Sequence, residues 1–324
     1  MFHTAEPFGW GVGPDGGTSA LANLQITDPQ AQRPRAAPTH LNVERSNHMA
    51  LELTAEGTSR YVQTKDWKIH YYEAGQGQPL LMLHGSGPGA TGWSNFGPNM
   101  RELAENFRCI AVDMPGWGKS DAVTLEERDH VEAALQVLDA LGIEKAAFIG
   151  NSMGGMTSIR FAMEHPDRIS HLITMGSGGG SALFSAAGRS EGIKVLQAAY
   201  HDPSPAGMRA LVDIMTFDPQ FATDELVNQR SEAATSRPDH LQNFIDGIPA
   251  GRKRLDLSPL ATSEVPALIV HGRDDRVVHF ENSLSLVSVI PNSRLVLLNR
   301  CGHWAMVEHP AEFNRLVADF VANN

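Results

Sequence analysis

The sequence is poor in cysteine, in long apolar runs and in positive charge. Its two cysteines, Cys109 and Cys301, are too few for a disulfide framework in 324 residues, which favours reduced thiols in a cytoplasmic protein. No run of about 18 apolar residues is present, and the first residues lack a basic segment followed by an apolar core. We therefore predict neither a membrane-spanning helix nor a secretory signal. Lysine and arginine total 26 against 37 aspartates and glutamates, for a formal net charge of -11. Because an acidic surface repels nucleic acid and anionic membranes, we expect neither as a partner.

Hydrophobic periodicity is missing from residues 1–50, which are rich in Gly, Pro, Ala, Thr and Gln and are predicted to be a disordered tail. From about residue 61, short apolar runs bounded by turn residues alternate with helical stretches. Runs of this kind indicate strands buried on both faces, at 80–83, 109–112, 146–149, 172–175, 267–270 and 295–298. Two segments alternate as half-buried strands, 61–63 and 68–73, and helical spacing recurs at 125–141, 157–164 and 310–320. The pattern predicts an α/β fold with a doubly wound, mostly parallel sheet.

The alternation of strands and helices stops between residues 177 and 261. This segment has helical patterns at 192–200 and 208–216 and few strand signals. A helical insertion into an α/β core is most often a lid over the site, so we predict a lid at 177–261. A plain structural elaboration is the alternative. The core is then formed by residues 51–176 and 262–324.

A nucleophile motif follows the predicted strand at 146–149. The residues Gly150-Asn151-Ser152-Met153-Gly154 match G-x-S-x-G, and a helical stretch comes next. This strand–turn–helix context is the one in which the motif presents a reactive serine. The turn exposes the hydroxyl, and side chains two positions to either side would collide with their neighbours. Ser152 is therefore the predicted nucleophile.

Serine needs a base, and the base needs an orienting acid. In G-x-S-x-G hydrolases the acid and then the histidine follow the serine along the chain, each after a late strand. The turn after the strand at 267–270 contains Asp274 and Asp275, and its G-x-x-D-x-x-V spacing selects Asp275. His303 follows the last strand directly, in Cys301-Gly302-His303-Trp304. Among the other histidines, we expect His271 to be a packed or hydrogen-bonded core residue, and His130 and His171 to lie on the surface.

An oxyanion hole needs two backbone N–H groups. One donor should be Met153, directly after the nucleophile, and the other should lie in the glycine-rich loop 84–89. We choose the N–H of Ser86 by position, with Gly87 as the alternative. A phosphate-binding interpretation of this loop fails because the loop lacks the lysine and the dinucleotide spacing. The histidines also lack metal-ligand spacing, so neither a metal nor an organic cofactor is expected.

Four segments together resemble one family more specifically than the triad alone does. They are H-G-S-G-P-G-A-T-G-W-S-N at 84–95, G-N-S-M-G-G at 150–155, G-R-D-D-R at 272–276 and C-G-H-W-A at 301–305. These segments resemble the meta-cleavage-product hydrolases, carbon–carbon bond hydrolases of aromatic catabolism with the α/β-hydrolase fold. The resemblance implies a 2-hydroxy-6-oxohexa-2,4-dienoate substrate, cleaved by water at C5–C6 to 2-hydroxypenta-2,4-dienoate and a carboxylic acid. It also implies ketonisation before attack on C6, and a homodimer or homotetramer.

The same resemblance implies a polar subsite for the substrate carboxylate and 2-oxo group, formed by Asn95, Asn151 and Arg230, with Trp304 beside the base. Each residue has a local alternative. Asn95 could cap a helix, Asn151 could serve the elbow turn, Arg230 could be a solvated lid residue and Trp304 could pack in the core. An arginine facing a buried pocket is costly without an anionic ligand, so Arg230 discriminates best between these interpretations.

The sequence departs from some family members at two places. Ser86 stands where some have glycine, which leaves the backbone donor intact. Residues 186–190 read A-A-G-R-S where some have Pro-Met-Pro near the distal pocket, which leaves the C6 substituent open as methyl, alkyl or aryl. The competing hypothesis is a carboxylesterase with the same triad and fold, whose pocket has no need for Arg230. A haloalkane dehalogenase would require aspartate at Ser152, and a non-catalytic binding protein would not require the triad.

Overall fold

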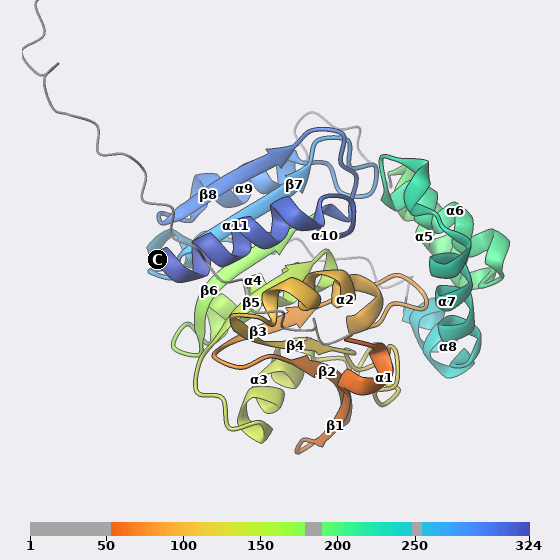
Figure 1. The fold of residues 1–324 in the computed structure, drawn as a ribbon, viewed down its shortest axis with the longest axis horizontal. Helices are drawn as coiled ribbons and strands as arrows, with labels where there is room; N and C mark the ends of the chain where they lie inside the picture. The colour runs from red at the N-terminus through yellow and green to blue at the C-terminus, as the bar shows by residue number, and fades with distance from the viewer. Residues whose placement is uncertain (1–52, 179–189, 248–254) are drawn as a thin grey trace, which may run out of the picture. The chain divides into compact units, whose positions relative to one another are not determined.

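A computed structural model of the chain describes residues 53–178, 190–247 and 255–324. Eight strands form one sheet in the order β1-β2-β4-β3-β5-β6-β7-β8 (Figure 1). β1 pairs antiparallel with β2, β2 pairs antiparallel with β4, and all other pairs are parallel, which confirms the predicted sheet. The strands are β1 (Ser59–Gln63), β2 (Lys68–Ala74), β3 (Gln78–Leu83), β4 (Phe107–Val112), β5 (Ala146–Asn151), β6 (Ile169–Met175), β7 (Ala267–Gly272) and β8 (Ser293–Leu298). The tail predicted at 1–50 lies outside the described residues.

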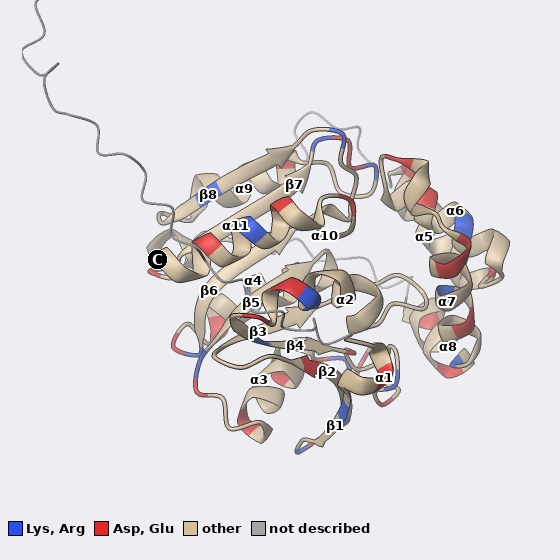
Figure 2. Cartoon of the chain, in the orientation of Figure 1, with Lys and Arg blue, Asp and Glu red and all other residues tan. Residues whose placement is uncertain are grey.

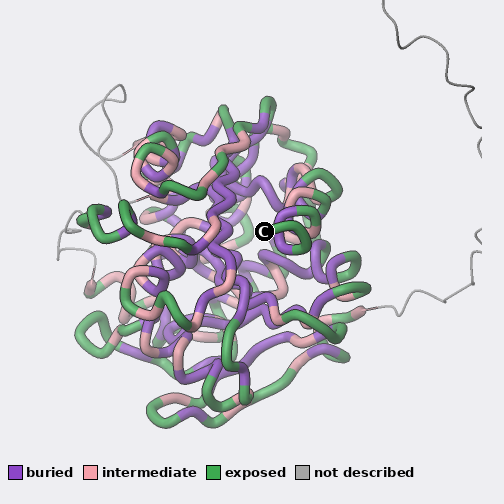
Figure 3. The backbone as a smooth tube through the Cα atoms, turned by 90° about the vertical axis from the view of Figure 1, so that its left-hand side faces the viewer, coloured by how far each residue is buried: buried purple, intermediate pink, exposed green. Residues whose placement is uncertain are grey.

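Successive side chains of the central strands enter two different hydrophobic clusters, one on each face of the sheet. In β3, Leu80 and Met82 join one cluster, while Leu81 and Leu83 join the other, as the two-residue repeat of a strand requires. The first face is covered by α2 (Gly92–Leu103), α10 (Ala305–Glu308) and α11 (Pro310–Asn323). The second is covered by α3 (His130–Ala140), α4 (Met153–Glu164) and α9 (Glu281–Val289). The central strands consequently run through the buried interior, and exposed residues gather on the outer turns of the helices (Figure 3).

Several details differ from the sequence predictions. β8 was expected to be buried on both faces, but it is an edge strand, and Leu297 is 42% exposed. β2 was expected to be half-buried, but it lies between β1 and β4 and is mostly buried. The helix predicted from 125 begins only at His130, where the Asp129 side chain accepts backbone N–H groups of the first turn. His130 and His171 are buried, not at the surface.

A helical insertion separates β6 from β7. It consists of α5 (Glu191–His201), α6 (Pro205–Met215), the short 3-10 helix η1 (Pro219–Phe221), α7 (Asp224–Thr235) and α8 (Pro238–Gly247). The side chains of Ser190, Ser204 and Thr223 cap α5, α6 and α7 by accepting a backbone N–H of the first turn. Acidic residues are spread along these helices (Figure 2). Among the described residues, no helix combines the length and apolar character that crossing a membrane requires.

Candidate active site

Ser152 occupies a strained turn between β5 and α4. Its backbone has φ 51 and ψ -111, a conformation that is unfavourable for a residue with a side chain. The turn is held because the Ser152 N–H donates to the Met175 carbonyl at 2.9 Å and the Gly154 N–H donates to the His84 carbonyl at 3.1 Å. A Cβ atom at Gly150 or Gly154 would collide with backbone, which explains both glycines of the motif.

Asp275 and His303 meet at the carboxyl ends of β7 and β8, 28 residues apart in the chain. The Nδ1 of His303 lies 2.7 Å from Oδ2 of Asp275, and both side chains are at most 2% exposed. Oδ1 of Asp275 accepts the backbone N–H groups of Val277 and Val278 at 2.7 and 2.9 Å. Burial opposes the ionisation of Asp275, yet the neighbouring imidazoles outweigh it and hold the pKa of Asp275 below its usual range. Asp274, the rejected alternative, turns away and accepts the Arg300 N–H at 3.1 Å.

One narrow cleft brings most of the predicted site together. Ser152 and His303 line it with Leu196 of α5 and Met215 of α6. All the other predicted residues except Asp275 and Met153 line it too, namely Ser86, Asn95, Asn151, Arg230 and Trp304. The Met153 side chain packs against the second core cluster, and its predicted role requires only its backbone N–H at the start of α4. The arrangement combines a hydroxyl, an imidazole with a buried carboxylate, and a guanidinium in one small space.

Comparisons with known proteins agree with this geometry. A family model described as alpha/beta hydrolase fold matches residues 78–310. A 2-hydroxy-6-oxononadienedioate/2-hydroxy-6-oxononatrienedioate hydrolase of Cupriavidus pinatubonensis (strain JMP 134 / LMG 1197) is 41% identical over 282 residues, covering 84% of this chain and 98% of that protein. A 2-hydroxy-6-oxo-6-phenylhexa-2,4-dienoate hydrolase of Comamonas testosteroni is 41% identical over 283 residues, covering 83% of this chain and 98% of that protein. The solved meta-cleavage product hydrolase CumD from Pseudomonas fluorescens IP01 aligns with a TM-score of 0.74 at 32% identity, covering 81% of this chain and 96% of CumD.

The chain belongs to the meta-cleavage-product hydrolases. The resemblance seen in the four sequence segments is thereby confirmed, and so is the α/β-hydrolase fold. The chain is a carbon–carbon bond hydrolase of the serine type on this fold.

Arg230 of this hydrolase is a buried cation that has no carboxylate partner in the part of the chain that the structure describes. The side chain is 1% exposed, and among the described residues it forms no ion pair. One Nη donates to the Pro88 carbonyl at 3.3 Å, Nε has no partner, and the guanidinium lies 4.9 Å from the centre of the Trp304 ring. Burial lowers the pKa of Arg230 to about 10, so the group stays charged at neutral pH. Such a charge is costly unless an anion enters the cleft.

The two asparagines of the predicted subsite are placed differently. Asn151 donates through Nδ2 to the carbonyls of Met175 and His303 at 3.3 and 3.2 Å, which ties the elbow to the base loop. Its Oδ1 is buried and has no hydrogen-bond partner among the residues that the structure describes. Asn95 does not cap α2, because Thr91 and Ser94 form the capping box there. Asn95 instead donates to the Thr91 carbonyl at 3.1 Å from within the helix.

The predicted oxyanion loop is held by Tyr200 and Trp117, which were not predicted from the sequence, and by His84 of the loop itself. Tyr200 of α5 donates its hydroxyl to the Ser86 carbonyl, and Trp117 Nε1 lies 3.2 Å from both the Gly87 carbonyl and the Tyr200 oxygen. His84 Nδ1 lies 2.8 Å from the Gly85 carbonyl. Because a peptide group is planar, fixing the Gly85 and Ser86 carbonyls also fixes the N–H groups of Ser86 and Gly87, the two candidate donors.

Replacing Tyr200 by phenylalanine should lower kcat by about tenfold with little change in KM, because the loop loses the bond that orients one donor peptide. The ring remains stacked on Phe244 at 3.8 Å between centroids, so the fold should be retained. Steady-state kinetics measures the effect, with the exposed Tyr61→Phe as the matched control. An unchanged kcat in Tyr200→Phe would show that the hydroxyl does not position the donors.

Glu308 of α10 joins the base loop to the helical insertion. Its Oε2 accepts the Gly302 N–H at 2.6 Å, and its Oε1 accepts the N–H groups of Phe217 and Asp218 at 2.7 and 3.1 Å. The His303 N–H itself donates to the Met215 carbonyl at the end of α6, at 2.7 Å. Burial raises the pKa of Glu308 against the lowering effect of these backbone hydrogen bonds.

Glu308→Gln should lower the free energy of unfolding by about 2 kcal/mol, because an amide NH₂ would face a backbone N–H and leave a buried donor unpaired. Urea denaturation followed by circular dichroism measures this change. Glu312→Gln is the control, since Glu312 is exposed on the neighbouring helix α11 and should shift stability by less than about 0.5 kcal/mol. Equal stabilities for the two variants would show that the Glu308 contacts contribute nothing to stability.

Proposed function

We propose that this hydrolase cleaves the C5–C6 bond of a 2-hydroxy-6-oxohexa-2,4-dienoate, giving 2-hydroxypenta-2,4-dienoate and a carboxylic acid. The observation that carries the proposal is the buried guanidinium of Arg230, which forms no ion pair with any described residue, in the cleft that Ser152 and His303 line. A dienoate supplies the missing anion through its carboxylate. An ordinary ester offers no charge to Arg230, which is why the carbon–carbon hydrolase is preferred over a carboxylesterase.

The geometry supports a reaction in four steps: ketonisation, attack, cleavage and hydrolysis of the acyl-serine. The substrate carboxylate pairs with Arg230, and the dienol ketonises so that C5 becomes able to leave as a stabilised carbanion. His303 then takes the Ser152 proton while the oxygen attacks the C6 carbonyl, and the backbone N–H groups of the oxyanion loop and Met153 stabilise the oxyanion. Collapse breaks the C5–C6 bond, its electron pair passes into the conjugated dienolate, and the proton held by His303 passes to the 2-oxygen to give 2-hydroxypenta-2,4-dienoate. Water activated by His303 hydrolyses the acyl-serine and restores the enzyme.

The proposal is tested by supplying dienoates with methyl, isopropyl and phenyl groups at C6, together with a p-nitrophenyl ester. Loss of the visible absorbance of the dienolate follows the first three, and release of nitrophenolate follows the ester. We expect at least one dienoate to exceed the ester in kcat/KM by about a hundredfold or more. A preference for the ester over all three dienoates would make the chain a carboxylesterase, and the ranking among the dienoates identifies the C6 substituent.

We also propose the cytoplasm as the compartment. Cys109 and Cys301 are both buried free thiols, and burial raises the pKa of Cys109 to about 12, which keeps it protonated and unreactive. Assembly as a homodimer or homotetramer stays a prediction from the family resemblance, and light scattering of the purified full-length chain tests it.

A further inference from the structure

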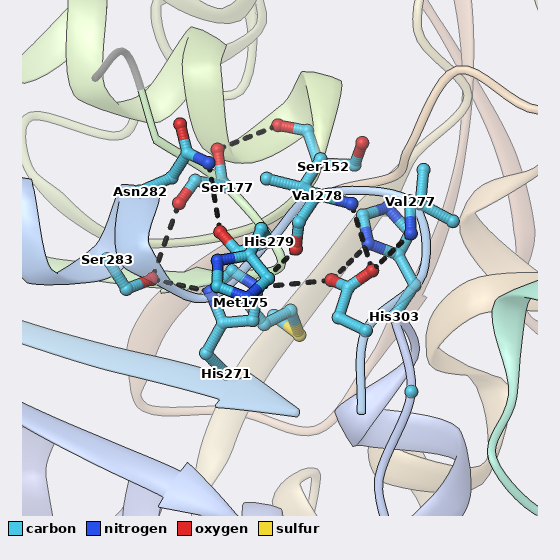
Figure 4. Close-up of polar contacts among 12 residues, drawn as sticks. Ser152, Met175, Ser177, His271, Val277, Val278, His279, Asn282, Ser283 and His303 are labelled. Atoms are coloured by element: carbon cyan, nitrogen blue, oxygen red, sulfur yellow. Dashed lines mark hydrogen bonds and ion pairs between the residues drawn. The ribbon is translucent and has the colours of Figure 1, made fainter. Parts of the chain in front are cut away.

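Asp275 is contacted by a second imidazole besides that of His303. Nε2 of His271, on β7, lies 3.1 Å from Oδ2 of Asp275, the same oxygen that His303 approaches at 2.7 Å. Both His271 and Asp275 have side chains that are 0% exposed. Figure 4 shows the contacts of His271 with its neighbours on one side and those of His303 on the other. One carboxylate oxygen therefore serves two histidines.

The neighbours of His271 decide which nitrogen carries its proton. Nε2 faces two oxygens that can only accept, Oδ2 of Asp275 and the Val278 carbonyl at 2.8 Å, so Nε2 carries a hydrogen. Nδ1 lies 2.6 Å from the hydroxyl of Ser283. That hydroxyl lies 3.5 Å from its other acceptor, the Ser177 carbonyl, so it donates preferentially to Nδ1. His271 is thus held as a neutral ring that donates through Nε2.

The other charged groups around Asp275 are directed to partners of their own. Arg276 donates to the carbonyls of Asp213 and Thr216 in the insertion. On the remaining elements, the charged neighbours are Asp274 with Arg273, Glu308 on the Gly302 N–H, and Glu281 of α9 with His279. The Cys301 thiol is also titratable and nearby, but burial raises its pKa and keeps it neutral. The two imidazoles are accordingly the titratable side chains in direct contact with the carboxylate among the described residues.

We propose that His271 is a positioning residue that shares Oδ2 of Asp275 with His303 and so limits how strongly the carboxylate stabilises protonated His303. A donor on Oδ2 fixes the rotation of the carboxylate and withdraws charge from the oxygen that faces the base. Without that donor, Asp275 interacts more strongly with the imidazolium, and the base stays protonated to higher pH. The inference rests on the proposed function only in taking His303 as the base of Ser152.

The test compares His271→Gln with His271→Asn. The glutamine amide reaches the position of Nε2 and can still donate to Asp275, whereas the shorter asparagine amide reaches only the Nδ1 position beside Ser283. The readout is the rate at which diisopropyl fluorophosphate inactivates Ser152 from about pH 5 to pH 9, because this rate depends on the free base. We expect the acid limb of the profile to coincide for wild type and His271→Gln, and to move upward by about one pH unit in His271→Asn. An unmoved limb in His271→Asn, or equal displacement in both variants, would overturn the proposal.

The wild-type protein provides a second measurement that no folding defect can obscure. Nitrogen-15 spectra of its imidazoles, recorded at pH 8, should show that the hydrogen of His271 is on Nε2 and that Nδ1 accepts. A His271 ring protonated at Nδ1 would overturn the proposal. The inhibitor reacts with Ser152 independently of any substrate, so the two proposals can fail separately. If no dienoate is cleaved but the inactivation profiles are as expected, the proposed function is refuted and this inference stands.

Discussion

Ser152→Ala is expected to lower kcat for the dienoate by about 10⁴-fold or more, because the variant has no oxygen with which to attack C6. Binding should survive the change. The oxyanion loop, Arg230 and Asn151 are untouched by it, and the dienolate colour should persist as a stable bound spectrum. Alanine is also compatible with the fold, since the strained φ of 51 at this position is fixed by the surrounding backbone bonds and the flanking glycines.

Stopped-flow absorbance separates the two effects, since it records binding as a spectral shift and turnover as loss of colour. Ser288→Ala provides a matched control on the exposed surface of α9 and should keep kcat within about twofold of wild type. If Ser152→Ala keeps a near-normal kcat, the nucleophile has been assigned to the wrong residue. If Ser152→Ala loses both turnover and the spectrum of the bound dienolate, the hydroxyl also contributes to binding.

Arg230→Met is expected to lower kcat/KM for the dienoate, with a loss of transition-state stabilisation of about 2 to 4 kcal/mol. The kcat/KM for a neutral p-nitrophenyl ester should change far less. The reason is that a desolvated charge contact is lost only by the substrate that carries the carboxylate. Methionine keeps much of the volume beside Trp304. The free energy of unfolding should not fall, because a buried cation without an ion-pair partner among the described residues is replaced by an apolar side chain.

Arg209→Met is the matched control for Arg230→Met. Arg209 lies in the same insertion but forms its ion pair with Asp224 at the surface, so its loss should affect neither substrate measurably. Equal losses on ester and dienoate in Arg230→Met would remove the argument for a carboxylate subsite. The triad would remain, and the chain would then fit the carboxylesterase hypothesis better.

Features encoded by local spacing were predictable from the sequence. The G-x-S-x-G turn, the choice of Asp275 over Asp274 and the histidine after the last strand each depend on a few neighbouring residues. The helices at 192–200 and 208–216 could also be predicted, because the 3.6-residue repeat is visible in their apolar positions. The convergence of these residues then follows from the parallel sheet, whose strands end at the same edge.

Contacts between distant segments could not be predicted. Tyr200 is 114 residues from the Ser86 carbonyl that it binds, and Glu308 is 91 residues from Phe217. Nothing in the local sequence of either residue marks such a partner. His130 was predicted to lie at the surface, but it is buried, and its Nε2 lies 3.1 Å from the Pro115 carbonyl in the interior. The exposure of β8 depends on its place at the end of the strand order, which propensity alone does not specify.

The Glu308 contacts limit how substrate range can be altered by exchanging helices among relatives. A chimaera that replaced residues 190–247 as an independent module would also replace the backbone of Met215, Phe217 and Asp218, to which the loop around His303 is attached. The donor sequence would therefore change the position of His303, the general base, together with the wall of the pocket. Grafts that retain the host's residues 213–218 should preserve turnover where whole-segment exchanges lose it.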